Sequence, residues 1–120
     1  MPMAFLAAAF AALHVAFFAP PGGHAPRVGV EWRYTLRAWV TPTKPAHARL
    51  TAQIVDPLGG AHLVQFGKTN RYIRNFPFVG VFRDFVIWPK DSRGIPLTLR
   101  LTVVSGKAKR IVTYAVTPRA

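Results

Sequence analysis

The fold is decided by residues 28–40, which read VGVEWRYTLRAWV. Every even-numbered position in this stretch is apolar, whereas Glu31, Arg33, Thr35 and Arg37 stand at odd positions. Successive side chains of a strand point to opposite faces of a sheet, so the pattern predicts a strand with one buried and one solvated face. The stretch exceeds the usual strand length, and we therefore expect a bend or bulge near Gly29 or Thr35.

The same alternation recurs along the rest of the chain. It predicts strands at 50–54 and 97–103, with hairpin partners at 61–66 and 111–117. Residues 56–60 (DPLGG) predict the turn of the first hairpin. Residues 81–88 are apolar on both faces apart from Arg83 and Asp84, and Pro77 makes residues 67–80 irregular or edge-like. Six or seven short strands without a helix signal predict a single all-β domain over residues 26–120, an antiparallel β-sandwich.

The N-terminal segment has a different composition. Residues 1–26 contain no Lys, Arg, Asp or Glu, and residues 3–19 are apolar except for His14. We expect residues 1–25 to form an apolar helix that is either a signal peptide or a membrane anchor. A buried helix of a globular domain is a third interpretation.

The sequence is compatible both with cleavage of this segment and with its retention as an anchor. Small residues at Gly23 and Ala25 allow cleavage after Ala25, although Pro26 would hinder it. The arginines that follow favour an anchor with the domain held in the cytoplasm. An upstream start codon that adds a basic n-region would remove this conflict.

Little in the sequence indicates catalysis. The chain has no cysteine and only four acidic residues among sixteen Lys and Arg, so each carboxylate is expected to pair with an arginine or to cap a turn. Ser92 and Ser105 lie in predicted turns outside any nucleophile motif. His24, His47 and His62 lack the spacing of metal ligands. The sequence therefore predicts a protein that is not an enzyme, with no cofactor and no metal.

The net charge of +12 is the main indication of a partner. A strongly basic surface attracts polyanions. For an exported protein, the candidates are an anionic cell-envelope polymer, anionic lipid or another envelope protein. For a domain retained inside the cell, the alternative is nucleic acid. A third interpretation is that the arginines only provide solubility.

Residues 71–83 (RYIRNFPFVGVFR) combine rings with cations and form the candidate ligand-binding segment. The rings would stack on sugars or bases while the guanidinium groups meet anions. Pro77 and the lack of helices exclude the RNA-recognition module whose signature the segment partly matches. The alternative is that the aromatic residues fill the core beneath a long connection. The candidate ligand-binding residues are Arg71, Tyr72, Arg74, Phe76, Phe78 and Arg83.

The C-terminal strands carry a resemblance to a known class. Residues 82–89 (FRDFVIWP), 94–104 (GIPLTLRLTVV) and 113–117 (TYAVT) resemble the last strands of bacterial immunoglobulin-like domains. Over residues 28–118 the chain is similar to small exported immunoglobulin-like proteins of unassigned function. The resemblance implies an immunoglobulin-like fold and export, with Trp32 or Trp39 as the core tryptophan and no disulfide. It carries over no catalytic residues.

Overall fold

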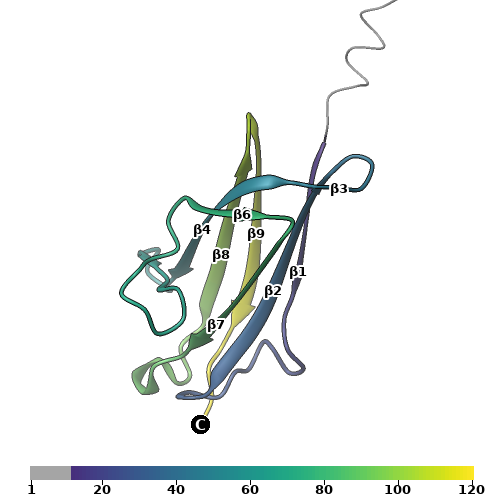
Figure 1. Ribbon diagram of the computed structural model, residues 1–120. Coiled ribbons are helices and arrows are strands. Elements are labelled where there is room, and N and C mark those ends of the chain that lie inside the picture. The colour runs from purple at the N-terminus through teal and green to yellow at the C-terminus, as the bar shows by residue number, and fades with distance from the viewer. Residues whose placement is uncertain (1–11) are drawn as a thin grey trace, which may run out of the picture.

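The computed structural model describes residues 12–120. Within them, nine strands form two antiparallel sheets that pack face to face (Figure 1). The first sheet contains β1 (Leu13–Phe18), β2 (Glu31–Val40), β3 (Lys44–Pro45) and β7 (Val81–Ile87). The second sheet contains β4 (His47–Val55), β5 (Ala61–Leu63), β6 (Phe76–Val79), β8 (Leu97–Ser105) and β9 (Ala108–Val116). A 3-10 helix, η1 (Lys90–Ser92), connects β7 to β8.

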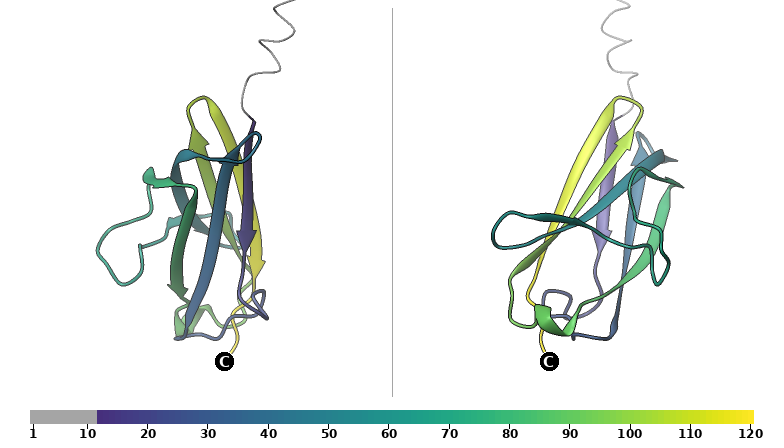
Figure 2. Two further views of the ribbon diagram at one scale, coloured as in Figure 1. Left: turned by 45° about the vertical axis from the view of Figure 1, so that its right-hand side comes forward. Right: turned by 90° about the vertical axis from the view of Figure 1, so that its left-hand side faces the viewer.

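Strand β2 is the centre of the first sheet. One edge of β2 pairs with β1, and the other edge pairs with β7 and, at the end of the strand, with β3. In the second sheet the order is β4-β8-β9, and β5 and β6 both pair with the remaining edge of β4. The views in Figure 2 show the two layers and the long β5–β6 connection that projects from one side.

The core lies between the two sheets. The alternation predicted for β2 is confirmed, because Trp32, Tyr34, Leu36 and Ala38 are buried and the side chains between them face outward. The second sheet contributes Leu50, Ala52, Leu99, Leu101 and Val103 to the same core. The predicted β-sandwich is therefore confirmed at the level of two packed antiparallel sheets.

Two expectations about the sandwich need correction. The described residues form nine strands rather than six or seven, because β1 and the short β3 were not expected. Of the two tryptophans considered for the core, Trp32 is buried and Trp39 only half-buried. Trp88 is completely buried and was not predicted. It follows β7 directly, at the end of a segment that is apolar on both faces, so the alternation gave no indication of its direction.

The expected N-terminal helix is wrong over residues 13–18. These residues form β1, which pairs with residues 35–40 of β2 in an antiparallel ladder. Leu13, Val15 and Phe17 pack against the core, so the segment also has a period of two, which its continuous apolar character conceals. The backbone N–H and C=O groups along this edge of β2 need hydrogen-bonding partners, which favours a strand over a helix for residues 13–18.

The other predictions for the N-terminal segment are not tested by the described residues. Its residues 1–11 lie outside the described part of the chain. In residues 12–120 no helix has both the length and the apolar character needed to cross a membrane. The assignment of residues 1–25 as a signal peptide or anchor, and of 26–120 as the domain, stays a prediction.

The register of β8 gives a direct test of the core. Leu99 and Leu101 are at most 1% exposed, whereas Thr98 and Thr102 face outward on the same strand. We expect Leu99→Ala or Leu101→Ala to lower the free energy of unfolding by about 2–5 kcal/mol, through lost burial and the cavity left behind. Thr98→Ala and Thr102→Ala should cost far less. Urea unfolding of the four variants measures this, and similar costs at all four positions would show that the register is wrong.

Candidate functional site

The outward side of the first sheet carries three arginines among aromatic rings. We call this surface the arginine face; it consists of Arg33, Arg37, Arg83, Phe18, Trp39 and Phe85. The pairing register fixes its rows. Arg33 lies opposite Phe85, Thr35 lies between Phe18 and Arg83, and Arg37 lies opposite Val81. The three arginines therefore occupy successive rows of one sheet surface.

The charges on the arginine face are only partly compensated. Arg33 forms an ion pair with Glu31, and its guanidinium carbon lies 5.1 Å from the centroid of the Phe85 ring. Among residues 12–120, Arg37 and Arg83 form no ion pair and donate no side-chain hydrogen bond. The two guanidinium groups are thus free to meet an anion.

The outward side of the second sheet differs in this respect. Arg49 donates to the carbonyl of Asn75 at 3.2 Å, and Arg100 donates two hydrogen bonds, of 2.8 and 3.2 Å, to the side-chain oxygen of Gln53. The other outward positions of β4, β8 and β9 carry threonines and apolar residues, among them Thr51, Thr102, Val104 and Ile111. The second sheet therefore carries comparable charge, but its arginines are engaged within the protein.

A cavity adjoins the arginine face at the edge of β7. Its volume is about 520 Å³, and the loop 66–69 forms one wall, so that Lys68 lines it together with Arg33 and Arg83. The loop approaches β7 closely at Gly67, which has a φ of +54°; a Cβ atom there would lie 3.3 Å from the Phe85 ring. A side chain at this position would push the loop away from the sheet. The loop thus adds a fourth cation beside the face.

A buried carboxyl group also lines this cavity. Asp84 lies opposite Tyr34 in the β2–β7 pairing, and both residues are buried. Among the described residues, Asp84 Oδ2 and Tyr34 Oη have no hydrogen-bond partner. Burial raises the pKa of Asp84, although the amide N–H groups of Phe85 and Gly67 and the charge of Arg33 oppose the shift. Burial, and then the Asp84 charge, raise the pKa of Tyr34.

The six residues predicted to bind a ligand are divided between different surroundings. Arg71, Tyr72 and Arg74 are exposed in the β5–β6 connection, and Tyr72 lines a cavity of about 640 Å³ that does not include Arg83. Arg83 belongs to the arginine face instead. The ligand-binding role of these residues stays a prediction, but the structure does not gather them into one pocket.

The two phenylalanines of that segment point inward. Phe76 packs on Phe66 and Phe82, with ring centroids 4.9 and 5.6 Å apart, and Phe78 lies 5.8 Å from Phe82. Both are partly buried against the core. The guanidinium of Arg71 covers the Phe76 ring at 4.9 Å. This geometry favours the alternative in which the rings fill the core beneath the connection.

Sequence reasoning missed Arg33, Arg37 and Lys68 as functional candidates. The alternation in residues 28–40 already placed both arginines on the solvated face of a strand. The alternation could not indicate which other strand would pair with this one. Only the pairing of β2 with β7 brings Arg83 between them, and only the path of the loop brings Lys68 near.

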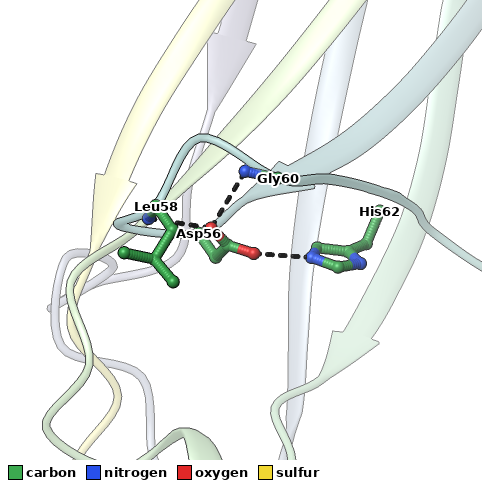
Figure 3. Close-up of polar contacts among 4 residues, drawn as sticks. All are labelled: Asp56, Leu58, Gly60 and His62. Carbon is green, nitrogen blue, oxygen red and sulfur yellow. Dashed lines mark hydrogen bonds and ion pairs between the residues drawn. The ribbon is translucent and has the colours of Figure 1, made fainter.

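Asp56 and His62 form the other polar contact of note, at the β4–β5 turn. Asp56 Oδ1 accepts hydrogen bonds from the amides of Leu58 and Gly60, each at 2.9 Å, and Oδ2 lies 2.8 Å from His62 Nε2 (Figure 3). The His62 hydrogen bond, followed by that of Gly60, lowers the pKa of Asp56. The pair closes a turn, and in residues 12–120 no three His, Cys, Asp or Glu side chains gather as metal ligands would.

The chain matches no protein-family model, no curated protein and no solved structure.

The packing of Phe76 can be tested separately from binding. We expect Phe76→Ala to lower the free energy of unfolding by about 2–3 kcal/mol, below the range for a fully buried ring because Phe76 is only partly buried. Affinity for an anionic polymer should not change at a temperature where the variant is folded. Thermal melts and titrations of the same sample measure both. A weaker affinity with an unchanged melting temperature would restore the ring to a binding role.

The two perturbed carboxyl groups should affect stability with opposite signs. Because the pKa of Asp84 is raised in the folded protein, the contribution of this group to the free energy of unfolding is present in acid. This contribution is lost as the pH rises above about 3.9, the pKa of the group in the unfolded chain. We therefore expect Asp84→Asn to be more stable than the natural chain at pH 7, with a difference that shrinks toward pH 3. Urea unfolding across this range measures it.

Asp56→Asn is the matched control. Because the pKa of Asp56 is lowered in the folded protein, the contribution of this group to the free energy of unfolding is present at pH 7 and is lost as the pH falls below about 4. This variant should be less stable than the natural chain at neutral pH. An Asp84→Asn variant that behaved in the same way would contradict the environment assigned to Asp84.

Proposed function

We propose that this protein is a non-catalytic, immunoglobulin-like binding module that is exported to or tethered in the cell envelope, and that its arginine face binds a linear anionic polymer. The observation that carries the proposal is that Arg33, Arg83 and Arg37 lie in successive rows of the sheet surface formed by β2 and β7. The guanidinium groups of Arg83 and Arg37 have no partner in residues 12–120. The alternative ligand, for a domain retained inside the cell, is nucleic acid.

The strand order supports the immunoglobulin-like part of the proposal. The sheets β1-β2-β7 and β4-β8-β9 have the chain order of strands A-B-E and C-F-G in immunoglobulin domains, and β5 and β6 occupy the edge of strand C. The chain departs from antibody domains in having no disulfide and no tryptophan on β4. Its buried Trp32 lies on β2 instead.

The spacing of the arginines supports a linear ligand. Rows on one face of a strand are two residues apart, or roughly 7 Å, so the three guanidinium groups extend over roughly 14 Å along the strand direction. A small anion could contact only one or two of these arginines, whereas a polymer with regularly repeated charges could contact all three. Guanidinium groups bind carboxylate, sulfate or phosphate through paired hydrogen bonds.

The aromatic residues support charge rather than stacking as the main source of affinity. Arg33 covers Phe85, and the His14 ring stacks on Trp39 with centroids 5.4 Å apart. Of the three rings of the face, Phe18 is the most open, at 50% exposed. Proteins that bind single-stranded nucleic acid use open rings on which successive bases stack. The arginine face therefore fits an anionic envelope polymer better than nucleic acid.

Binding to heparin, a linear sulfated glycan, tests this proposal. The logarithm of the association constant should fall with the logarithm of salt concentration with a slope of about 2, the value for three contacts on a single-stranded polyanion. We expect Arg37→Gln combined with Arg83→Gln to weaken binding about tenfold, as two exposed ion pairs would. The same pair of substitutions should reduce the slope by about 1 or more.

The matched control is Arg49→Gln combined with Arg100→Gln on the second sheet, which removes the same charge. Equal losses for the two double variants would leave only diffuse electrostatics and would contradict the assigned face. A tenfold tighter binding of oligothymidylate than of heparin, at the same salt concentration, would favour the nucleic-acid alternative.

A further inference from the structure

We infer that one end of the sandwich docks on the surface of an anionic lipid bilayer. We call it the hairpin end; it consists of β3, the start of β4 and the turn between β8 and β9. Its cations are Lys44, Lys107, Lys109 and Arg110, and all four residues are exposed. The inference goes beyond the proposed polymer site, because none of these residues belongs to the arginine face.

Strand pairing brings the four cations to the same end of the molecule. Ser105, the last residue of β8, donates a hydrogen bond from its hydroxyl to the carbonyl of His47, the first residue of β4, at 2.7 Å. Lys44 lies three residues before His47, in β3. Lys107 lies in the turn that follows Ser105, and β9 begins directly after it. Figure 1 shows β3 and the β8–β9 turn at the end of the sandwich opposite the C-terminus.

No acidic side chain lies at the hairpin end, although residues 12–120 include all four acidic residues of the chain. Glu31 begins β2 at the end away from β3, and Asp56 follows the far end of β4. Asp91 lies in η1, after β7 has run away from the hairpin end, and Asp84 is buried within β7. The positive charge of the hairpin end is therefore not compensated by the part of the chain that the structure describes.

Apolar side chains are exposed beside these cations. In the β8–β9 pairing, Val104 lies opposite Lys109, and Ile111 lies opposite Thr102. Ile111 is 54% exposed, and Val79 on β6 is 55% exposed. Val79 and Val104 line a cavity of about 470 Å³ next to the turn. Binding at a membrane interface is strengthened both by apolar area buried among headgroups and by attraction to anionic lipids.

The arrangement of the cations fits a membrane surface better than a linear polymer. They come from β3, the turn and β9, and they are grouped around one end instead of following a strand. Three of the four are lysines, whose compact charge on a flexible chain requires no fixed geometry of its partner. Clusters of four or more Lys and Arg next to a membrane are typical of binding to anionic lipids.

Vesicle binding of the full 120-residue chain tests the inference. The vesicles contain either phosphatidylcholine alone or equal amounts of phosphatidylcholine and phosphatidylglycerol, and bound protein is measured by co-sedimentation. We expect tighter binding to the mixed vesicles. Each cation near an anionic surface contributes about fivefold to affinity, so Lys107→Gln, Lys109→Gln and Arg110→Gln together should weaken binding on the order of a hundredfold.

The matched control removes three cations at the opposite end. Arg27, Lys90 and Arg93 are exposed there, near the start of β2 and in or next to η1. Their replacement by Gln gives the same net charge and should change vesicle binding far less. Equal losses for the two triple variants, or equal binding of the natural chain to both kinds of vesicle, would overturn the inference.

The apolar contact has its own pair of variants. Ile111→Ser should weaken binding to the mixed vesicles, because a polar side chain gains nothing from burial among headgroups. Ile95→Ser, which changes an isoleucine exposed at the other end, should not. Unchanged binding of the Ile111 variant would contradict the orientation assigned to the hairpin end.

Failure of this inference and failure of the proposed ligand can be told apart. Vesicle binding that depends on the hairpin end, together with heparin binding that does not depend on Arg37 and Arg83, would reject the polymer site and retain the membrane contact. Heparin binding that is lost in the hairpin-end variant, with vesicle binding unchanged, would assign these cations to the polymer and overturn the membrane contact.

Discussion

The structure depends on the pairing of β2 along both of its edges. One edge pairs with β1 and the other with β7 and β3, so β2 holds the first sheet together. Its inward side supplies Trp32, Tyr34, Leu36 and Ala38 to the core, and its outward side supplies Arg33 and Arg37 to the arginine face. A shift of one residue in this pairing would exchange the two sides and would abolish both the core and the face.

The same pairing imposes a cost inside the sandwich. Opposite Tyr34, β7 places the carboxyl group of Asp84 in the buried layer, where one of its oxygens has no partner within residues 12–120. Burial of an ionised carboxylate is unfavourable, and the raised pKa of Asp84 expresses that cost. The loop at Gly67 partly compensates, because its amide approaches the carboxyl group while Lys68 extends the cationic surface outside.

Much of the fold follows from alternation in the sequence. The strands around residues 31–40 and 97–105 were predictable because polar and apolar side chains alternate there without interruption. Residues 13–18 were not, because a run that is apolar at nearly every position satisfies a helix, a signal peptide and an edge strand equally well. Their conformation depends on residues 35–40 of β2, whose pairing partners in β1 lie seventeen or more residues earlier in the chain.

The candidate site was less predictable for a related reason. Residues 71–83 combine rings and arginines in the sequence, but folding turns Phe76 and Phe78 toward the core and leaves Arg83 on another surface. The arginines of the arginine face come from two strands, β2 and β7, that are separated by about forty residues, so no local motif encodes the face.

The most direct test of this account is amide hydrogen exchange of the folded chain, followed residue by residue. If β1 is a strand of the sandwich, the hydrogen-bonded amides of residues 13–18 should be protected to a degree comparable with those of their partners at 35–40. Exchange of residues 13–18 at the rate of an unstructured peptide, with β2 and β8 still protected, would contradict the central place given to this pairing.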